Sequence, residues 1–207
     1  RGQHPHVLVD PGHIRNELGE PCFNSLTQAM ERDGFRVEDI GLVINTHSHP
    51  DHFEASALLE ESGTLVTLSQ EEDDFYRSTG VMFYGMFGAK APAINPSFYL
   101  KEGDLSLGAK DKKVTVKVLP TPGHSPGSVS LYLEEEKILI SGDVVFFSSV
   151  GRTDFPGGSP SLLRKSIEQL SQLDVEYLVP GHSTEVGKII EGKEKVARNF
   201  QMVKMFI

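Results

Sequence analysis

The sequence predicts an α+β fold in which two β-rich halves each carry their own helices. Short apolar runs alternate with helical segments over roughly the first 75 residues, and an alternating β pattern begins at Val114. Helical patterns return after Ser159 and after Glu191. Two sheets faced by helices accommodate this order. The 207 residues suffice for one buried core, so we expect one domain over 1–207, open to further strands before Arg1.

The first half alternates strands and helices. Val7–Val9 is a β-type run closed by the turn Asp10-Pro11-Gly12. The remaining expected elements are a helix over Ser25–Asp33 stopped by Gly34, a buried strand at Leu42–Ile44, a helix over Phe53–Glu61 ended by Gly63, and a strand at Leu65–Leu68. Ser69 and the acidic residues after it are typical of a helix start.

Residues 75–100 differ from the rest because aromatic residues stand there among glycines and prolines with little periodicity. The pattern indicates a long loop or a broken helix. One interpretation is a flap packed on the body of the domain. The other is a wall of the substrate pocket or a dimer contact.

The second half is β-rich before it becomes helical. Val114, Val116 and Val118 alternate with polar residues. We expect a hairpin formed by Ser128–Leu133 and Lys137–Ile140, a helix from Ser159-Pro160 to about Leu173, a strand over Glu176–Val179, and a last helix from Glu191 to Phe200 or beyond.

Composition excludes several classes of function. The net charge of −9 argues against a protein that binds the phosphate backbone of nucleic acids. No uncharged apolar stretch reaches about 18 residues, so we expect no membrane span. Cys22 is the single cysteine, which excludes an intrachain disulfide and a Cys-rich metal site. We therefore expect a cytoplasmic protein with a small-molecule substrate.

Five of the eight histidines stand at strand ends or turns, and three of them share the segment His47-Ser48-His49-Pro50-Asp51-His52. His47 and His49 could hold one metal ion, and Asp51 with His52 could hold a second ion nearby. After later strands, His124 supplies a third imidazole for the first site and His182 completes the second. Asp143, in Ser141-Gly142-Asp143, could bridge both cations.

Each of these residues also has a structural interpretation. A single histidine after a strand is usually a hydrogen-bonded turn residue, and a single Gly-Asp pair is usually a turn. The spacing His-x-His-x-Asp-His rarely arises by chance, and it favours the metal interpretation for His124, Asp143 and His182 as well.

These residues give the sequence a resemblance to the metallo-β-lactamase superfamily. Its pattern matches, in order, Asp10, His47, His49, Asp51, His52, His124, Asp143 and His182. The resemblance implies an αββα four-layer sandwich. It assigns His47, His49 and His124 to the first metal, Asp51, His52 and His182 to the second, and Asp143 to both. It makes Asp10 a residue that orients ligands.

The segment Gly151-Arg152-Thr153-Asp154-Phe155-Pro156-Gly157-Gly158 resembles the glyoxalase II (hydroxyacylglutathione hydrolase) group in its short form, and the related persulfide dioxygenases. The resemblance implies that Arg152 binds a carboxylate of the substrate. The alternative is an ion pair with Asp154 that shapes the loop. Asp154 departs from the family pattern, which has an aromatic glutathione contact there.

A further departure concerns the C-terminus. Full-length glyoxalase II has a C-terminal helical domain that contacts glutathione, and 25 residues follow His182 here. We expect that domain to be missing from this sequence. Common class B β-lactamases place a cysteine where Asp143 stands, and flavodiiron proteins replace the residue corresponding to His49 by glutamate. Antibiotic hydrolysis and flavodiiron chemistry are therefore not expected.

The leading hypothesis is a metal-dependent hydrolase of thioesters. It would use a metal-bridged hydroxide, with Asp51 and Asp143 fixing the cluster and the nucleophile. Two divalent ions are implied, zinc foremost, with iron or manganese as alternatives. The alternative functions are a persulfide dioxygenase with one iron, a hydrolase of another ester, lactone or phosphodiester, and a metal-binding module without catalysis.

Overall fold

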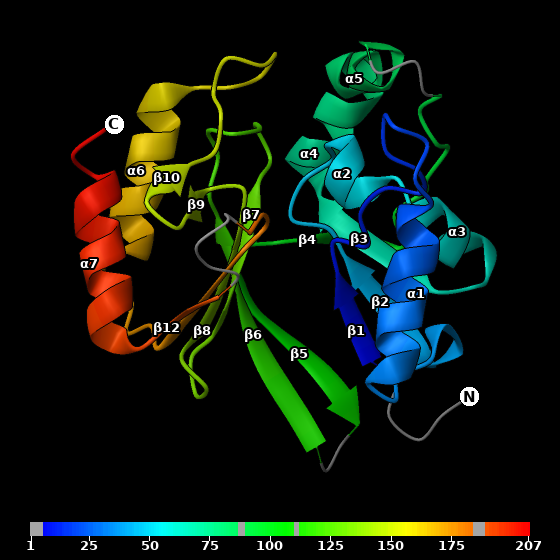
Figure 1. Cartoon of the computed structure of the whole chain (residues 1–207), viewed down its shortest axis with the longest axis horizontal. Helices are drawn as coiled ribbons and strands as arrows, with labels where there is room; N and C mark the ends of the chain where they lie inside the picture. The colour runs from blue at the N-terminus through cyan, green and yellow to red at the C-terminus, as the bar shows by residue number, and fades with distance from the viewer. Residues whose placement is uncertain (1–5, 87–89, 110–111, 184–188) are drawn as a thin grey trace. The chain divides into compact units, whose positions relative to one another are not determined.

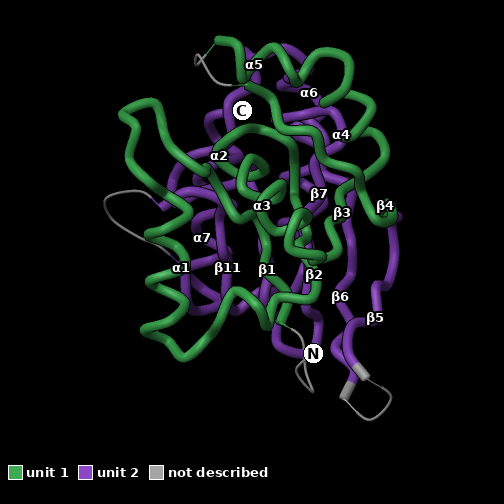
Figure 2. Tube along the Cα trace, turned by 90° about the vertical axis from the view of Figure 1, so that its right-hand side faces the viewer, with its two compact units in different colours: residues 1–100 green, residues 101–207 purple. Residues whose placement is uncertain are grey.

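The computed structural model describes residues 6–86, 90–109, 112–183 and 189–207. The chain forms two compact units, which Figure 2 shows in separate colours. Unit 1 covers Arg1–Leu100 and unit 2 covers Lys101–Ile207. A single domain over 1–207 stays a prediction.

Unit 1 is built on a parallel sheet. Its strands follow the order β1 (His6–Val9), β2 (Ile40–Ile44), β3 (Leu65–Ser69) and β4 (Phe98–Leu100). The predicted strands at 7–9, 42–44 and 65–68 are confirmed. Because parallel strands end at the same edge, the turns after β1, β2 and β3 share one edge of this sheet. Polar residues from all three turns therefore lie within reach of one another.

Short helices cover this sheet. They are α1 (Cys22–Arg32), the 3₁₀ turn η1 (Val37–Asp39), α2 (Pro50–Phe53), α3 (Ser56–Glu61), α4 (Gln70–Phe75), the π-helical turn η2 (Tyr76–Gly80) and α5 (Val81–Met86). Helices α1 and α3 lie on one face of the sheet (Figure 1). The core of unit 1 includes Val43, Phe53, Leu59, Leu68 and Tyr84.

The prediction of one helix over Phe53–Glu61 was wrong. The helical turn begins earlier, at Pro50, and the chain breaks between α2 and α3. The cause is a hydrogen bond from the Ala55 amide to the Gly12 carbonyl at 2.8 Å, which replaces a continuing helical bond. The first helix also starts at Cys22 rather than at Ser25, and the turn at Gly34 is left-handed as expected.

The aromatic segment is a broken helix rather than a long loop. Helical turns run from α4 through η2 to Met86, where α5 ends. Tyr76, Phe83 and Tyr84 are buried, and the Tyr76 hydroxyl donates to the Pro92 carbonyl at 2.6 Å. Burial raises the pKa of the Tyr76 and Tyr84 phenols, so both stay neutral. This segment therefore packs into the core of unit 1; Phe87 lies outside the described residues.

Unit 2 is built on a six-stranded sheet. Its order is β12 (Ile190–Glu191), β11 (Tyr177–Pro180), β8 (Ile138–Gly142), β7 (Val129–Leu133), β6 (Lys112–Pro120) and β5 (Gly103–Ala109). The predicted hairpin is confirmed as the antiparallel pair β7–β8. Strand β5 was not predicted. Its glycines read locally as turns, and it becomes a strand because it pairs with β6 along its whole length.

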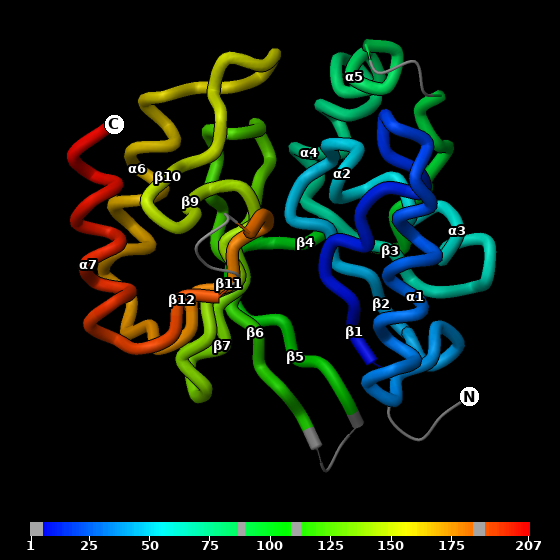
Figure 3. Tube along the Cα trace, viewed as in Figure 1, coloured from blue at the N-terminus to red at the C-terminus, as the bar shows by residue number. Residues whose placement is uncertain are grey.

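Two helices pack on this sheet. Helices α6 (Pro160–Leu170) and α7 (Lys193–Val203) run side by side and share one core cluster (Figure 3). Ser159 caps α6 and Pro160 opens it, as predicted. Helix α6 ends at Leu170, before Leu173, and α7 begins two residues after Glu191 because β12 occupies that position. A small hairpin, β9 (Val145–Phe146) with β10 (Ser149–Val150), follows β8.

The structure confirms the α+β fold class, with a sheet and helices in each unit. Among the described residues, no helix has the length and apolar character needed to cross a membrane.

Candidate metal centre

Three imidazole rings gather in the turn after β2. His47, His49 and His52 are 1%, 6% and 2% exposed. The ring centroid of His47 lies 4.8 Å from that of His49 and 4.1 Å from that of His52. Imidazole is the most frequent side-chain ligand of transition metals, and a buried group of three is typical of such sites.

Asp10, in the turn after β1, forms hydrogen bonds that fix this group of rings. Its Oδ1 accepts from the Thr46 amide at 2.7 Å, and its Oδ2 accepts from the Thr46 hydroxyl at 2.7 Å. Its Oδ2 also lies 3.0 Å from Nδ1 of His52. Asp10 has a φ of 51°, a left-handed conformation that aspartate tolerates better than most residues. The predicted orienting role of Asp10 agrees with these contacts.

This network determines which nitrogen of each ring carries the proton. A carboxylate only accepts, so Nδ1 of His52 must donate to Asp10. The Thr46 hydroxyl gives its single proton to Asp10, so Nδ1 of His47, at 3.1 Å, must donate to that hydroxyl. In the neutral rings, Nε2 of His47 and of His52 is then a lone-pair donor suited to a cation.

Asp51 adds a carboxylate to the same group. Its Oδ2 lies 3.9 Å from Nε2 of His52, and its side chain is 40% exposed. Phe83 of α5 packs against His49, with its ring centroid 4.7 Å from that of His49. The aromatic segment therefore supplies one wall beside a predicted ligand as well as core packing.

In unit 2, two predicted histidine ligands converge on one oxygen of a third predicted ligand, Asp143. Oδ2 of Asp143 lies 3.4 Å from Nε2 of His124 and 3.3 Å from Nε2 of His182. Asp143 and His124 are buried, while His182 is 47% exposed. An oxygen that faces two imidazole nitrogens in this way suits a carboxylate that binds two cations.

The hairpin β9–β10 brings the Arg152 loop back against these residues. The Arg152 carbonyl accepts from Nδ1 of His124 at 2.7 Å, which leaves Nε2 of His124 as the metal-facing nitrogen. A Cβ at Gly151 would lie 1.8 Å from the Asp143 carbonyl oxygen and 3.1 Å from Nδ1 of His124. Only glycine permits this close approach.

The Arg152 side chain forms the ion pair that was one of its two interpretations. Its Nε and Nη2 donate to the two oxygens of Asp154 at 2.9 and 2.7 Å, and both side chains are largely exposed. The guanidinium also lies 4.1 Å from the Phe155 ring centroid. The hydrogen bond from Arg152 lowers the pKa of Asp154 to about 2.

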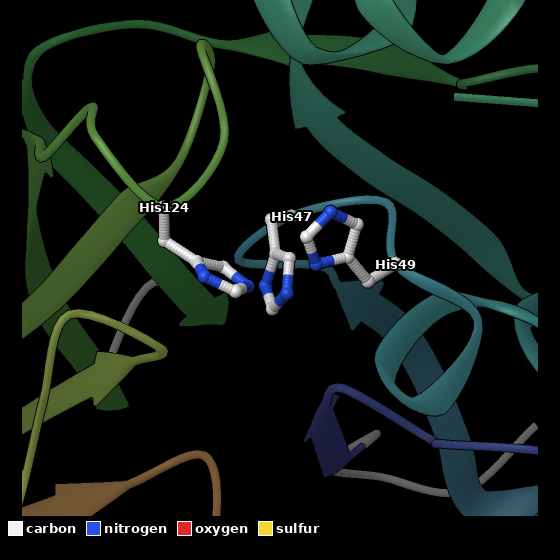
Figure 4. Close-up of side chains that lie close together, drawn as sticks. All are labelled: His47, His49 and His124. Atoms are coloured by element: carbon white, nitrogen blue, oxygen red, sulfur yellow. The ribbon is translucent and has the colours of Figure 1, made fainter. Parts of the chain in front are cut away.

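The predicted ligands thus form two sets. His47, His49, Asp51 and His52 come together in unit 1, and His124, Asp143 and His182 come together in unit 2. Figure 4 draws His47 and His49, which follow β2, together with His124, which follows β6. Four or more imidazoles with carboxylates suit zinc, iron or manganese rather than calcium or magnesium.

The sequence pattern did not single out several residues that support these ligands. The Thr46 hydroxyl links the Asp10 carboxylate to Nδ1 of His47 by hydrogen bonds. Gly151 lies close to His124, and the Arg152 carbonyl accepts a hydrogen bond from it. Glu72 holds Ser48. The position of Thr46 beside the first histidine was a usable signal, whereas the other contacts depend on backbone atoms or on residues distant in sequence.

The chain is similar to many known proteins and solved structures, including two relatives and two structures that bear on its function. A probable metallo-hydrolase of Methanocaldococcus jannaschii is 34% identical over 97% of this chain and 89% of its own length. The hydroxyacylglutathione hydrolase GloC of Haemophilus influenzae is 30% identical over 72% of this chain and 73% of its own.

The first structure, a protein in a di-iron-bound form, has a TM-score of 0.72 and 31% identity over 93% of this chain and 87% of its own. The second, the B3 metallo-β-lactamase BLEG-1, has a TM-score of 0.70 and 29% identity over 95% and 88%. The family model of the metallo-β-lactamase superfamily matches residues 1–182. With its fold, its ligand sets and this match, the chain belongs to the metallo-β-lactamase superfamily.

Proposed function

We propose that this protein is a metal-dependent hydrolase of thioesters, related in activity to the glyoxalase II group. The observation that carries the proposal is the convergence of His124 and His182 on one oxygen of Asp143, at 3.4 and 3.3 Å. An oxygen that lies between two imidazole nitrogens suits a carboxylate shared by two cations.

We further propose that the two ligand sets act together. His47, His49 and His124 would hold the first ion, and Asp51, His52 and His182 the second, with Asp143 shared. The orientation of the rings supports this assignment, because hydrogen bonds to Nδ1 of His47, His52 and His124 direct Nε2 of each ring toward a cation. Zinc is the first expectation, and the di-iron form of a similar protein makes iron the second.

Divalent cations at such a site make hydroxide available near neutral pH and polarise the carbonyl oxygen that is attacked. The residues of this chain supply positioning. Asp10 and Thr46 hold the rings of His47 and His52, and buried Phe83 excludes water from one side of His49. No residue need act as a strong general acid, because a thiolate is a good leaving group.

A thioester substrate is favoured by the Gly151–Gly158 segment and by the similarity to a hydroxyacylglutathione hydrolase. Arg152 would bind a substrate carboxylate. Its pair with Asp154 uses Nε and Nη2, so the Nη1 edge of the guanidinium is not part of that pair. An Arg152→Gln variant should raise KM for an anionic thioester several-fold and leave kcat nearly unchanged.

The test is elemental analysis of protein purified without added metal, followed by assay on lactoylglutathione. We expect about two transition-metal ions per chain and thioester cleavage that Asp143→Ala abolishes. An Asp33→Ala variant is the matched control, because Asp33 is an exposed residue at the end of α1. It should retain full activity.

Three outcomes would overturn the proposal in distinguishable ways. One iron per chain with oxygen uptake on glutathione persulfide would identify a dioxygenase. The protein would belong to another substrate class if it holds two metal ions and cleaves a β-lactam, another ester, a lactone or a phosphodiester, but not the thioester. Full activity in Asp143→Ala would reject the metal centre.

A further inference from the structure

We propose that Glu72 is a positioning residue for the first metal site and acts through Ser48. The inference rests on the proposed function, since it concerns how His47 and His49 are held for a cation. Glu72 lies outside the His-x-His-x-Asp-His segment, on α4, 24 residues after Ser48.

The contact is a double hydrogen bond to one oxygen. Oε1 of Glu72 accepts from the Ser48 amide at 2.9 Å and from the Ser48 hydroxyl at 2.7 Å. Glu72 is 0% exposed and Ser48 is 2% exposed. Burial strengthens such hydrogen bonds. Their loss is destabilising because the buried donors and acceptors that remain cannot form hydrogen bonds with water.

The backbone of Glu72 is itself held in place. The Glu72 amide donates to the Ser69 hydroxyl at 3.1 Å, which caps α4 directly after β3. Ser69 is the last residue of β3, a central strand that pairs with β2 and β4. The hydrogen bonds therefore connect the ligand turn after β2 to the rigid end of the neighbouring strand.

Ser48 occupies the position at which this connection affects both ligands. It stands between His47 and His49, whose rings lie 4.8 Å apart between centroids. Adjacent peptide units are planar and nearly inextensible, so a shift of the Ser48 backbone moves one or both rings. Asp10 and Thr46 hold His47 from one end of the turn, and Glu72 holds its middle.

A purely structural role would make Glu72 important for folding but not for the metal. A positioning role predicts that metal affinity falls in variants that still fold. It also predicts that Ser48→Ala weakens metal binding less than Glu72→Ala does. Glu72→Ala removes the acceptor of both Ser48 donors, whereas Ser48→Ala removes the hydroxyl donor only.

The experiment measures the zinc affinity of the full chain by competition with a chromophoric chelator, alongside the melting temperature of the metal-free protein. Cobalt-substituted protein gives an absorption spectrum that reports ligand geometry independently of activity. The variants are Glu72→Ala and Ser48→Ala. The matched control is Glu71→Ala, because Glu71 is exposed and stands in the same first turn of α4.

We expect Glu72→Ala to weaken zinc binding about 10- to 100-fold and to change the cobalt spectrum. Ser48→Ala should lose a smaller factor than Glu72→Ala, and Glu71→Ala should match the wild type. If Glu72→Ala does not fold, an unchanged affinity and cobalt spectrum in Ser48→Ala overturns the inference, and a loss supports it.

Other outcomes separate the two levels of the argument. A wild-type chain that binds no transition metal would refute the proposed function itself. A wild-type chain that binds zinc, together with a Glu72→Ala variant of equal affinity and unchanged spectrum, would refute the positioning role alone.

Discussion

The Asp10→Asn substitution tests whether the Asp10 carboxylate determines which ring nitrogen of the predicted ligands carries the proton. Asparagine keeps the shape of the side chain and tolerates the left-handed φ of 51° at this position, so the backbone need not change. Only the acceptor pattern changes. The carboxylate receives three donors, namely the Thr46 amide, the Thr46 hydroxyl and Nδ1 of His52.

Neither orientation of the asparagine amide satisfies all three donors. With its oxygen toward the Thr46 amide, its NH₂ group faces Nδ1 of His52, and that ring must move its proton to the metal-facing Nε2. With the oxygen toward His52, the NH₂ group faces the Thr46 amide, whose residue is 1% exposed. A buried donor left without an acceptor costs about 1–3 kcal/mol. A loss of about 1.4–2.8 kcal/mol in the free energy of metal binding corresponds to a 10- to 100-fold weaker affinity.

The measurement is the zinc dissociation constant by chelator competition, with the melting temperature of the metal-free protein as a second readout. Asp39→Asn is the control, because Asp39 pairs with Arg36 in an exposed contact and precedes β2, whereas the predicted ligands follow the other end of that strand. Its affinity should be unchanged. An Asp10→Asn protein that binds zinc within about threefold of the wild type would show that this reasoning is wrong.

Three other predictions concern unit 2 and the metal. Gly151→Ala places a methyl group 1.8 Å from the Asp143 carbonyl and should lower kcat about 100-fold, whereas Gly85→Ala, with open space around it, should be neutral in the same assay. Because its pKa is lowered to about 2, Asp154 should stay ionised until the pH falls through that value; carboxyl NMR in Arg152→Gln should show the midpoint rising toward 3.8. Removing metal with a chelator should lower the melting temperature, and zinc at about 100 times its dissociation constant should restore about 2.7 kcal/mol. An unchanged melting curve would contradict metal binding by the native state.

Local patterns were sufficient for most elements with a strong hydrophobic run. The strands at 7–9, 42–44 and 65–68, the hairpin β7–β8 and helix α6 lie close to their expected limits. These segments bury a continuous apolar face, so local preference and tertiary packing favour the same structure.

The failures occurred where a distant partner decided the local structure. Strand β5 has two glycines and depends on its pairing with β6. The break after α2 depends on the Gly12 carbonyl, which lies far from Ala55 in sequence. No window of neighbouring residues contains either partner, so periodicity could not predict them.

The sequence by itself predicted the candidate metal ligands of this protein. The spacing of His47, His49, Asp51 and His52, and the positions of His124, Asp143 and His182 after strands, were enough to predict a metal centre, because donor types and strand ends are local properties. The tertiary structure alone decided how these ligands are oriented. Which ring nitrogen carries the proton depends on Asp10, Thr46 and the Arg152 carbonyl. The turn after β2 is held by Glu72 through Ser48. These contacts join residues that are distant in sequence, and hydrogen-bond direction exists only once the chain has brought donor and acceptor together.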